Sequence, residues 1–491
     1  MGNIFIIEPT WKRLGFTSIP DKNTSGKDVG IVILDTIRSH SKIKHLGKHL
    51  RYILVNDDLS IESRFTAFEE SEDFSSSHGE HGLMSLLLLS HLSFNYNGEV
   101  HTGIVPAANF IVLNHGAFRD GEGERLKRGI NWILERKLDW NIRIILCTGW
   151  NILDQGGWLE STRKKPTVYG LSAAVKAGLM VIAANGNTRY ENELPPIEYL
   201  SVGGYIDRGS SDMNRHVPFL DEPWGRNGDG NMRPDVLAPR LYLPVPYCEE
   251  KETLEKVSFF GGTSGAATLV TGVCAHVLSL YPSLDLETLR EVLIASGLPI
   301  NGYDNKAPRV IAANVITAIA KGYKISKRPQ CNVAIKLENP LISLHSNDPI
   351  KRGLALTILI KQGKFCRGDI WKHVMDPSQI VRKVAIWALQ KPDSLAERDL
   401  FWKYLNKEDE CGVRGFLLYG LLYDATKEEI NSWISWITDI NWSVRWCVSE
   451  YFKKFSEFPQ LEKTHDPDLI EEKAAPMLKW YNKRKEKTDD Y

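Results

Sequence analysis

The sequence lacks long hydrophobic runs and any excess of one charge. Lys plus Arg and Asp plus Glu each number 61, so the formal net charge is zero. No overall electric field would therefore draw the chain toward nucleic acid or an anionic membrane. The longest wholly apolar run near the start is Leu86–Leu89, far short of the roughly 20 residues that span a bilayer. We expect neither nucleic acid nor a membrane among the partners.

A secretory signal and a disulfide framework are also missing. The first twenty residues lack the basic start, apolar centre and small-residue cleavage site of a signal peptide. The seven cysteines are odd in number, widely scattered and free of metal-ligand spacing. Such cysteines are typical of reduced, mostly buried thiols. The sequence therefore predicts a cytoplasmic protein.

The chain is long enough for more than one hydrophobic core. It has 491 residues, of which 43% are hydrophobic and 25% are charged, close to the averages for folded chains. The character of the sequence changes near residue 325. We predict five parts: an N-terminal extension (1–27), an α/β domain (28–322), a linker (323–335), a helical repeat domain (336–460) and a C-terminal helical tail (461–491).

The first of the two large parts alternates short β-branched runs with longer amphipathic stretches. This alternation is typical of a parallel sheet with crossover helices. The predicted strands are Gly30–Leu34, Asn109–Leu113, Ile142–Cys147, Leu179–Ala183 and Tyr199–Val202. The predicted helices are Glu80–Leu92, Arg125–Lys137, Leu171–Ala177, Ser264–Tyr281, Asp285–Ser296 and Ala312–Ala320.

Beyond residue 330 one helical pattern recurs, anchored by an apolar residue followed by a basic one. The anchor arginines are 30, 32 and 31 residues apart: Arg352, Arg382, Arg414 and Arg445. Apolar or small residues follow each anchor at helical spacing. A repeat of this length cannot bury its own apolar face, so neighbouring repeats must stack into an all-α solenoid. The pattern resembles HEAT-like repeats.

Two features of these repeats have two interpretations each. An anchor arginine could bind an acidic ligand, or pair with a carboxylate of the next repeat and hold the stack together. Eight of the 14 tryptophans lie in this part of the chain, and they could line a peptide groove or fill the space between repeats. We favour the structural interpretation for both.

Four short motifs in the α/β part carry the chemistry. Asp35 ends an apolar strand, where it would either face a ligand crevice or cap a turn. The segment 78–82 reads His-Gly-Glu-His-Gly at a helix entrance; its i, i+3 histidines lack the i, i+4 spacing of a zinc pair. Ser264 follows Gly-Gly-Thr at a helix start, without the lysine of a nucleotide-binding loop. Asn187 ends a strand-turn segment.

Together, in the order Asp, His, Asn, Ser, these motifs resemble the subtilisin-like serine proteases. The separations are 43, 109 and 77 residues when His78 is taken as the histidine. The segments at 103–109 (Gly-Ile-Val-Pro-Ala-Ala-Asn) and 233–239 (Arg-Pro-Asp-Val-Leu-Ala-Pro) resemble two further motifs of that family. The resemblance covers roughly residues 28 to 320. It implies a subtilisin-like parallel sheet with helices on both faces.

The resemblance also implies a role for each residue. Ser264 would be the nucleophile, His78 the general base, and Asp35 the carboxylate that orients the imidazole. Asn187 would donate its side-chain amide to the oxyanion. Cys147-Thr148-Gly149 aligns with a segment that pairs with substrate as an added strand. The substrate would be a protein or peptide, bound extended.

Some departures from the family pattern qualify this prediction. Ile37 follows Thr36 where the family usually has glycine, and Thr268 replaces a usual proline. Neither change removes a reacting group, so we predict an active serine endopeptidase. The alternatives are a silent scaffold with the same fold, and acyl transfer to an amine. We predict no cofactor and no metal, since no acidic cluster has convincing calcium-ligand spacing.

The repeat domain needs a function of its own. Only about 27 residues precede the first predicted strand, which is short for the inhibitory prodomain that family resemblance implies. A cytosolic protease needs restraint, so we expect the helical repeats to gate or target the enzyme by recruiting a regulatory or substrate protein.

Overall fold

The computed structural model describes most of the chain. The described residues are 7–37, 41–65, 78–117, 120–149, 162, 165–187, 194–219, 223–246, 257–300, 307–323, 337, 339–454 and 461–488. The chain forms two compact units. The first comprises Met1–Gly186, Glu193–Pro218 and Trp224–Ala334; the second comprises Ile335–Tyr491 with two short pieces, Asn187–Asn192 and Phe219–Pro223. Of the predicted linker 323–335, all but Tyr323 lies outside the described residues.

The first unit is built on a mostly parallel nine-stranded sheet in the order β10-β9-β8-β7-β1-β6-β2-β3, with β13 also paired to β9. The two antiparallel pairings are β10 with β9 and β3 with β2. The strands are β1 (Gly30–Leu34), β2 (Leu50–Val55), β3 (Ile61–Phe65), β6 (Asn109–Asn114), β7 (Ile142–Cys147), β8 (Met180–Ala184), β9 (Leu200–Ile206), β10 (Val217–Pro218) and β13 (Val236–Pro239). The described residues also form three separate two-stranded sheets. They are β4 (Phe94–Tyr96) with β5 (Glu99–His101), β11 (Gly225–Arg226) with β12 (Met232–Arg233), and β14 (Leu243–Val245) with β15 (Ser258–Phe260).

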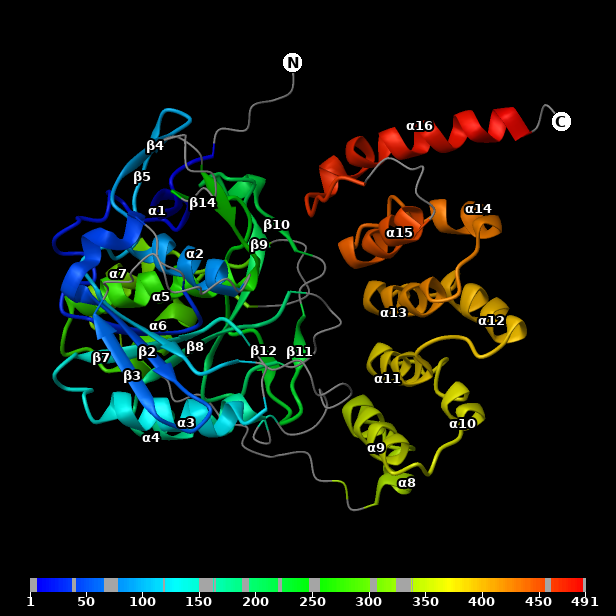
Figure 1. Cartoon of the computed structure of the whole chain (residues 1–491), viewed down its shortest axis with the longest axis horizontal. Coiled ribbons are helices and arrows are strands. Elements are labelled where there is room, and N and C mark those ends of the chain that lie inside the picture. The colour runs from blue at the N-terminus through cyan, green and yellow to red at the C-terminus, as the bar shows by residue number, and fades with distance from the viewer. Residues whose placement is uncertain are drawn as a thin grey trace. The chain divides into compact units, whose positions relative to one another are not determined.

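Helices cover both faces of this sheet (Figure 1). They are α1 (Thr10–Arg13), η1 (Ser41–His49), α2 (His78–Ser90), α3 (Glu122–Leu134), α4 (Pro166–Lys176), η3 (Met213–Arg215), α5 (Gly262–Leu280), α6 (Leu286–Ala295) and α7 (Ala312–Ala320). Side chains alternate along β1: Ile31 and Ile33 join the core shared with α2 and α5, whereas Val32 and Leu34 join the core shared with α3 and α4. Strands buried on both faces need such continuous apolar runs.

The N-terminal residues and the longest helix of this unit both contribute to its core. The segment predicted as an N-terminal extension, 1–27, contributes to the first unit, because Leu14 and Phe16 belong to its core. Helix α5 is, among the described helices, the one long and apolar enough to cross a membrane by length and composition. In its most apolar window 83% of the residues are buried inside the molecule, which is the burial of a core helix.

The second unit is helical. Its elements are α8 (Pro340–Ser343), α9 (Pro349–Lys361), α10 (Arg367–Trp371), α11 (Gln379–Leu389), α12 (Leu395–Leu405), α13 (Cys411–Leu422), η4 (Lys427–Glu429), α14 (Ile430–Ile434), α15 (Trp442–Lys454), η5 (Pro467–Leu469) and α16 (Ile470–Thr488). Helix α9 contacts α11, α11 contacts α13, and α13 contacts α15. Helices α10, α12 and α14 lie between them in the sequence. Asp348 caps α9 ahead of a proline in its first turn.

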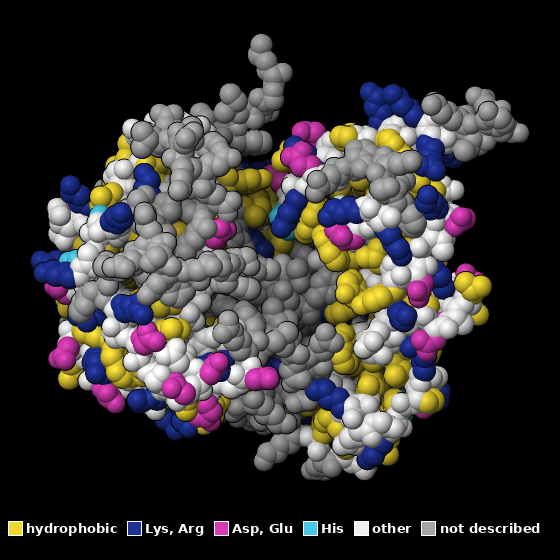
Figure 2. Space-filling view, in the orientation of Figure 1, with side chains coloured by type: hydrophobic (Ala, Val, Ile, Leu, Met, Phe, Trp, Pro, Cys, Tyr) yellow, Lys and Arg dark blue, Asp and Glu magenta, His cyan; other side chains and the backbone are white. Residues whose placement is uncertain are grey.

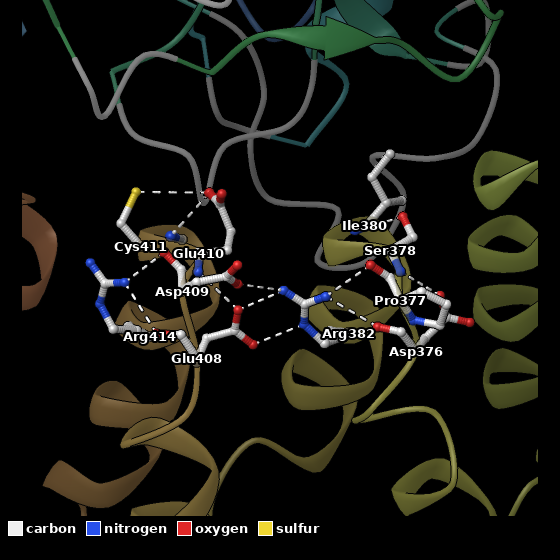
Figure 3. A network of polar contacts seen from close by, with 11 residues as sticks. Asp376, Pro377, Ser378, Ile380, Arg382, Glu408, Asp409, Glu410, Cys411 and Arg414 are labelled. Atoms are coloured by element: carbon white, nitrogen blue, oxygen red, sulfur yellow. Dashed lines mark hydrogen bonds and ion pairs between the residues drawn. The ribbon is translucent and has the colours of Figure 1, made fainter.

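Three of the four anchor arginines pair with a carboxylate of the following helical segment, and Figure 3 shows the pair of Arg382 with Glu408. The fourth, Arg445, donates to Thr464 O at 2.7 Å. Arg382 contacts both carboxylate oxygens of Glu408, at 2.9 and 2.6 Å. Arg352 binds Asp376 in the same bidentate way, and Arg414 binds Asp439 at 2.9 Å. Each of the three also donates to backbone carbonyls five or six residues upstream. These contacts confirm the structural interpretation of the three arginines.

A second row of ion pairs, which was not predicted, starts from arginines on α10 and α12. Arg367 binds Glu397, and the Trp371 indole donates to the same carboxylate. One repeat later, Arg398 and Trp402 bind Glu429 in the same way. The signal was present as Arg-x-x-x-Trp at 367–371 and 398–402. These two tryptophans therefore join successive segments, as expected from the packing interpretation.

Candidate active site

The candidate nucleophile lies in the first turn of the central helix. Ser264 is the third residue of α5 and is 6% exposed. Gly262 begins the helix with φ of 72°, a conformation that glycine adopts without steric cost. Its amide donates to Arg240 O, and Thr268 Oγ1 donates to Ser264 O at 2.8 Å. The N-terminus of a helix favours negative charge, so developing anionic charge at Ser264 would be stabilised.

Asp35 follows the last residue of β1, at the carboxyl end of the parallel sheet. Its Oδ2 accepts a hydrogen bond from His81 Nδ1 at 2.7 Å, and its Oδ1 accepts from the amide of Thr36 at 2.8 Å. The Asp35 side chain is 12% exposed and that of His81 is 40% exposed. With Nδ1 donating to the carboxylate, His81 Nε2 is left as the acceptor that a general base needs.

The structure describes a histidine partner of Asp35 that was not predicted, His81, while His78 as the base stays an untested prediction. Both histidines stand before a glycine in α2, and they lie three residues apart on it. A Cβ on Gly82 would lie 2.1 Å from Thr36 O, so glycine is what lets the helix approach Asp35 this closely. The side chain of His78 lies outside the described residues.

The environment of His81 raises its pKa above 6.5. Burial by itself lowers the pKa, because it disfavours the charged ring. The hydrogen bond to Asp35 and the negative charge of that carboxylate act in the opposite direction and outweigh burial. The Phe260 ring meets the His81 ring edge to face, with centroids 5.3 Å apart. Phe260 closes β15, four residues before Ser264, and thus brings the nucleophile segment to the histidine.

Thr148 links the carboxylate to the nucleophile. Its Oγ1 donates to Asp35 Oδ2 at 3.1 Å, and its carbonyl oxygen accepts from Ser264 Oγ at 3.4 Å. In this structure the Ser264 hydroxyl is therefore bonded to a backbone carbonyl next to the Asp35–His81 pair. Catalytic hydrogen bonds are often long in a free enzyme and tighten when substrate binds. Asp35, His81, Thr148 and Ser264 thus form one connected group.

The segment that presents Asn187 is fixed by its neighbours. Ser201 Oγ donates to the side-chain oxygen Oδ1 of Asn185 at 2.7 Å, and the backbone N–H of Asn185 donates to Val202 O at 3.0 Å. Thr263, next to the nucleophile, donates its hydroxyl to Gly186 O at 2.9 Å. Asn187 follows Gly186 directly and its side chain is exposed. The hydrogen bond of Thr263 to Gly186 therefore joins the residue before the predicted nucleophile to the residue before the predicted oxyanion donor.

The predicted substrate-binding residues have different environments. Cys147 is paired to Leu34 on one side and to Ala183 on the other, so its backbone offers no free edge to a substrate strand. Burial raises the pKa of its thiol to about 12, as expected of an unreactive cysteine. Cys147 is therefore a residue of the sheet. Thr148 and Gly149 follow the end of β7 and stay in the proposed substrate-binding segment.

The sequence analysis missed three contributors to this site. His81, the hydroxyl of Thr148 and the ring of Phe260 all contact the group that surrounds Asp35. The segment contains two histidine-glycine pairs, His78-Gly79 and His81-Gly82, and this signal alone does not distinguish which histidine contacts Asp35. Among the described residues, no group of three or more His, Cys, Asp or Glu side chains could hold a metal ion.

A model of the subtilase family, Peptidase_S8, matches residues 26–311, more than half of the chain. The chain belongs to the subtilase family. The matched region ends before the helical unit, so the family assignment applies to the subtilase domain. A search of curated proteins gave no match.

Solved structures similar to the chain include two proteases and a macrocyclase. A mutant of the protease domain of PatA is 20% identical, with 63% of this chain and 100% of that chain covered and a TM-score of 0.44. A protease from Pseudoalteromonas arctica is 18% identical, with 64% and 99% covered and a TM-score of 0.45. A PatG macrocyclase in complex with peptide is 17% identical, with 61% and 93% covered and a TM-score of 0.44.

Proposed function

We propose that this protein is a cytoplasmic serine endopeptidase that hydrolyses peptide bonds in protein substrates. The observation that carries the proposal is the 2.7 Å contact between His81 Nδ1 and Asp35 Oδ2. The Ser264 hydroxyl lies near this pair, because Thr148 contacts both Ser264 and Asp35. A carboxylate, an imidazole and a hydroxyl in this order make up the machinery of nucleophilic acyl transfer.

Each group has a definite task in the proposed reaction. His81 Nε2 takes the proton of Ser264 as Oγ attacks the scissile carbonyl carbon, and the charge that appears on the ring is stabilised by Asp35. The carbonyl oxygen becomes an oxyanion, which accepts hydrogen bonds from the Asn187 amide and the Ser264 backbone N–H. The proton then passes from His81 to the leaving amine, and water repeats the sequence to release the acid.

A fluorophosphonate probe tests the nucleophile directly. The parent protein should be labelled at Ser264, and Ser264→Ala should not be labelled. Absence of labelling in the parent would reject the endopeptidase in favour of the alternative, a silent binding scaffold with the subtilase fold. If labelling occurs, the mass of the products separates hydrolysis from acyl transfer to an amine, since hydrolysis adds one water.

We further propose that the helical unit is a HEAT-like repeat domain that recruits a regulatory or substrate protein. The repeated ion pairs at a spacing of about 31 residues support the repeat assignment. Aromatic side chains are exposed on α13 and α15: Tyr419 is 43% exposed, and its ring stacks on that of Trp446, with centroids 6.4 Å apart. Figure 2 shows hydrophobic side chains gathered on this unit among basic ones. Exposed aromatic clusters are typical of protein-binding surfaces.

A surface variant tests the recruitment proposal in the full chain. Tyr419→Ser together with Tyr423→Ser should reduce cleavage of the native protein substrate, while fluorophosphonate labelling of Ser264 stays at the parent rate. Leu395→Ser is the matched control, because Leu395 is 83% exposed on another helix of the same unit. Unchanged cleavage by the double tyrosine variant would reject this surface as the recruiting one.

A further inference from the structure

Thr148 contacts both ends of the proposed catalytic group through two different atoms. Its side-chain hydroxyl donates to Asp35 Oδ2, and its backbone carbonyl accepts from the Ser264 hydroxyl. The residue is 8% exposed, so water competes little for either contact. Leu34 and Cys147 are paired across the sheet, so Asp35 and Thr148, which follow them, leave adjacent strands side by side.

The Asp35 carboxylate has three hydrogen-bond donors among the described residues. The Thr36 amide binds Oδ1, whereas His81 Nδ1 and Thr148 Oγ1 share Oδ2. The neighbouring Thr36 hydroxyl is buried and, within the part of the chain that the structure describes, has no hydrogen-bond partner. Thr148 therefore supplies the hydroxyl on the oxygen that also binds the histidine.

We propose that Thr148 is a positioning residue: its hydroxyl fixes the Asp35 carboxylate and limits the negative charge that Oδ2 presents to His81. This inference rests on the function proposed above and gives that site a further member. A donor on a carboxylate oxygen disperses its charge, so the oxygen becomes a weaker acceptor for its second partner. Asp35 is the charged group that acts on the His81 ring, and the Phe260 ring packs against it from β15.

The direction of the effect follows from this arrangement. Removing the Thr148 hydroxyl leaves more negative charge on Oδ2, which favours the protonated form of His81. The pKa of His81 should therefore rise further. The Thr148 hydroxyl acts on His81 only through the shared carboxylate oxygen, so the shift should be small, about half a pH unit. The backbone carbonyl that holds Ser264 remains in place whatever the side chain is.

The test uses Thr148→Val, which keeps the shape of threonine and removes the hydroxyl, and Thr148→Ser, which restores the hydroxyl. Thr271→Val is the matched control, because Thr271 is fully buried on α5 and its hydroxyl has no hydrogen-bond partner among the described residues. The pKa of His81 is measured by NMR titration of the full-length protein, with the ring signal assigned from a His81→Gln spectrum. The pH dependence of fluorophosphonate labelling is recorded in parallel.

We expect the His81 titration midpoint to rise by about half a pH unit in Thr148→Val. It should stay at the parent value in both Thr148→Ser and Thr271→Val. An unchanged or lowered midpoint in Thr148→Val, or an equal shift in Thr148→Ser, overturns the proposal. The NMR titration needs no turnover, so it decides the role of Thr148 even if the parent fails to react with the probe. Failure of labelling would reject the proposed function instead.

Discussion

The Asp35–His81 pair of the first unit and the Arg382–Glu408 pair of the second bring opposite charges together for different purposes. In the subtilase domain a single carboxylate, Asp35, faces His81, whose side chain is 40% exposed and whose charge depends on pH. In the helical unit the carboxylates face arginines, which stay charged at every physiological pH. Arg382 and Glu408 are 15% and 7% exposed and meet in bidentate geometry. One arrangement can move a proton, whereas the other can only hold two helical segments together.

This difference predicts which property of the protein each pair affects. Loss of the Asp35–His81 pair should affect reaction rate and its pH dependence. Loss of an arginine pair should affect the stability of the helical unit and leave the chemistry of Ser264 unchanged. The experiments below test this separation.

The largest effect is expected at the base. His81→Ala should reduce turnover by about 10⁶-fold, because residues of a triad act as one unit. His78→Ala, one turn earlier on the same helix, is the control and should keep the parent rate. Rates are measured with a fluorogenic peptide and checked by fluorophosphonate labelling. The reverse result, a silent His78→Ala and an active His81→Ala, would refute the base assigned from the structure.

The next effect concerns the proposed oxyanion donor. Asn187→Ala should lower kcat by about 10²–10³-fold with a smaller change in KM, because the oxyanion exists only in the transition state. Asn114→Ala is the control, since Asn114 ends β6 and its side-chain amide donates to the Tyr52 hydroxyl. Steady-state kinetics decides the matter, and a change confined to KM would argue against an oxyanion role.

The arginine pairs give the third prediction. Arg382→Met should destabilise the helical unit by about 3 kcal/mol, because it leaves the largely buried Glu408 side chain without its partner. Hydrogen exchange of α11 and α13 measures this change locally. Lys407→Met is the control, since Lys407 is exposed in the same unit.

The double variant sharpens that result. Combining Arg382→Met with Glu408→Gln should cost less than the sum of the two single changes, because the unpaired charge is gone. Labelling of Ser264 should match the parent in all of these variants. A loss of labelling in Arg382→Met would break the proposed separation between the units.

The smallest effect is a shift with pH. The pKa of His81 is raised above 6.5, so labelling should fall as the solution is acidified through that higher pKa. The stability that the pair contributes has the opposite dependence: it is present below pH 6.5 and is lost as the pH rises through the raised pKa. Asp35→Asn should move the midpoint of the labelling profile below pH 6.5, since only burial would then act on the pKa of His81.

The carboxylates of the second unit provide the contrasting case. Burial acts to raise the pKa of Glu397, but hydrogen bonds from Arg367, the Asp393 amide and Trp371 outweigh it, so the pKa lies below 4.5. The stability from this group is therefore present above pH 4.5 and is lost as the pH falls through the lowered pKa. Thermal unfolding followed from about pH 5 to about pH 3 should show the helical unit losing stability there. A midpoint of unfolding that does not depend on pH in this range would contradict the assigned role of Glu397.

Much of the fold could be predicted because its signals are local. The runs Gly30–Leu34 and Ile142–Cys147 are strands with the predicted bounds, and α7 has its predicted bounds as well. Anchor arginines at near-constant spacing predicted the repeated helices. The pairing of Arg367 and Arg398 was missed because their partners are 30 and 31 residues away in sequence.

By itself the sequence determined the residue types at the site: a carboxylate after a strand, histidine-glycine at a helix entrance, and a serine in a glycine-rich helix start. These follow from short-range patterns of burial and backbone freedom. The three-dimensional fold was needed to show that His81 contacts Asp35 and that Thr148 contacts both the carboxylate and the nucleophile. The reason is geometric: these residues are far apart in the sequence, and the packing of α2 against the end of β1 brings His81 within hydrogen-bond distance of Asp35.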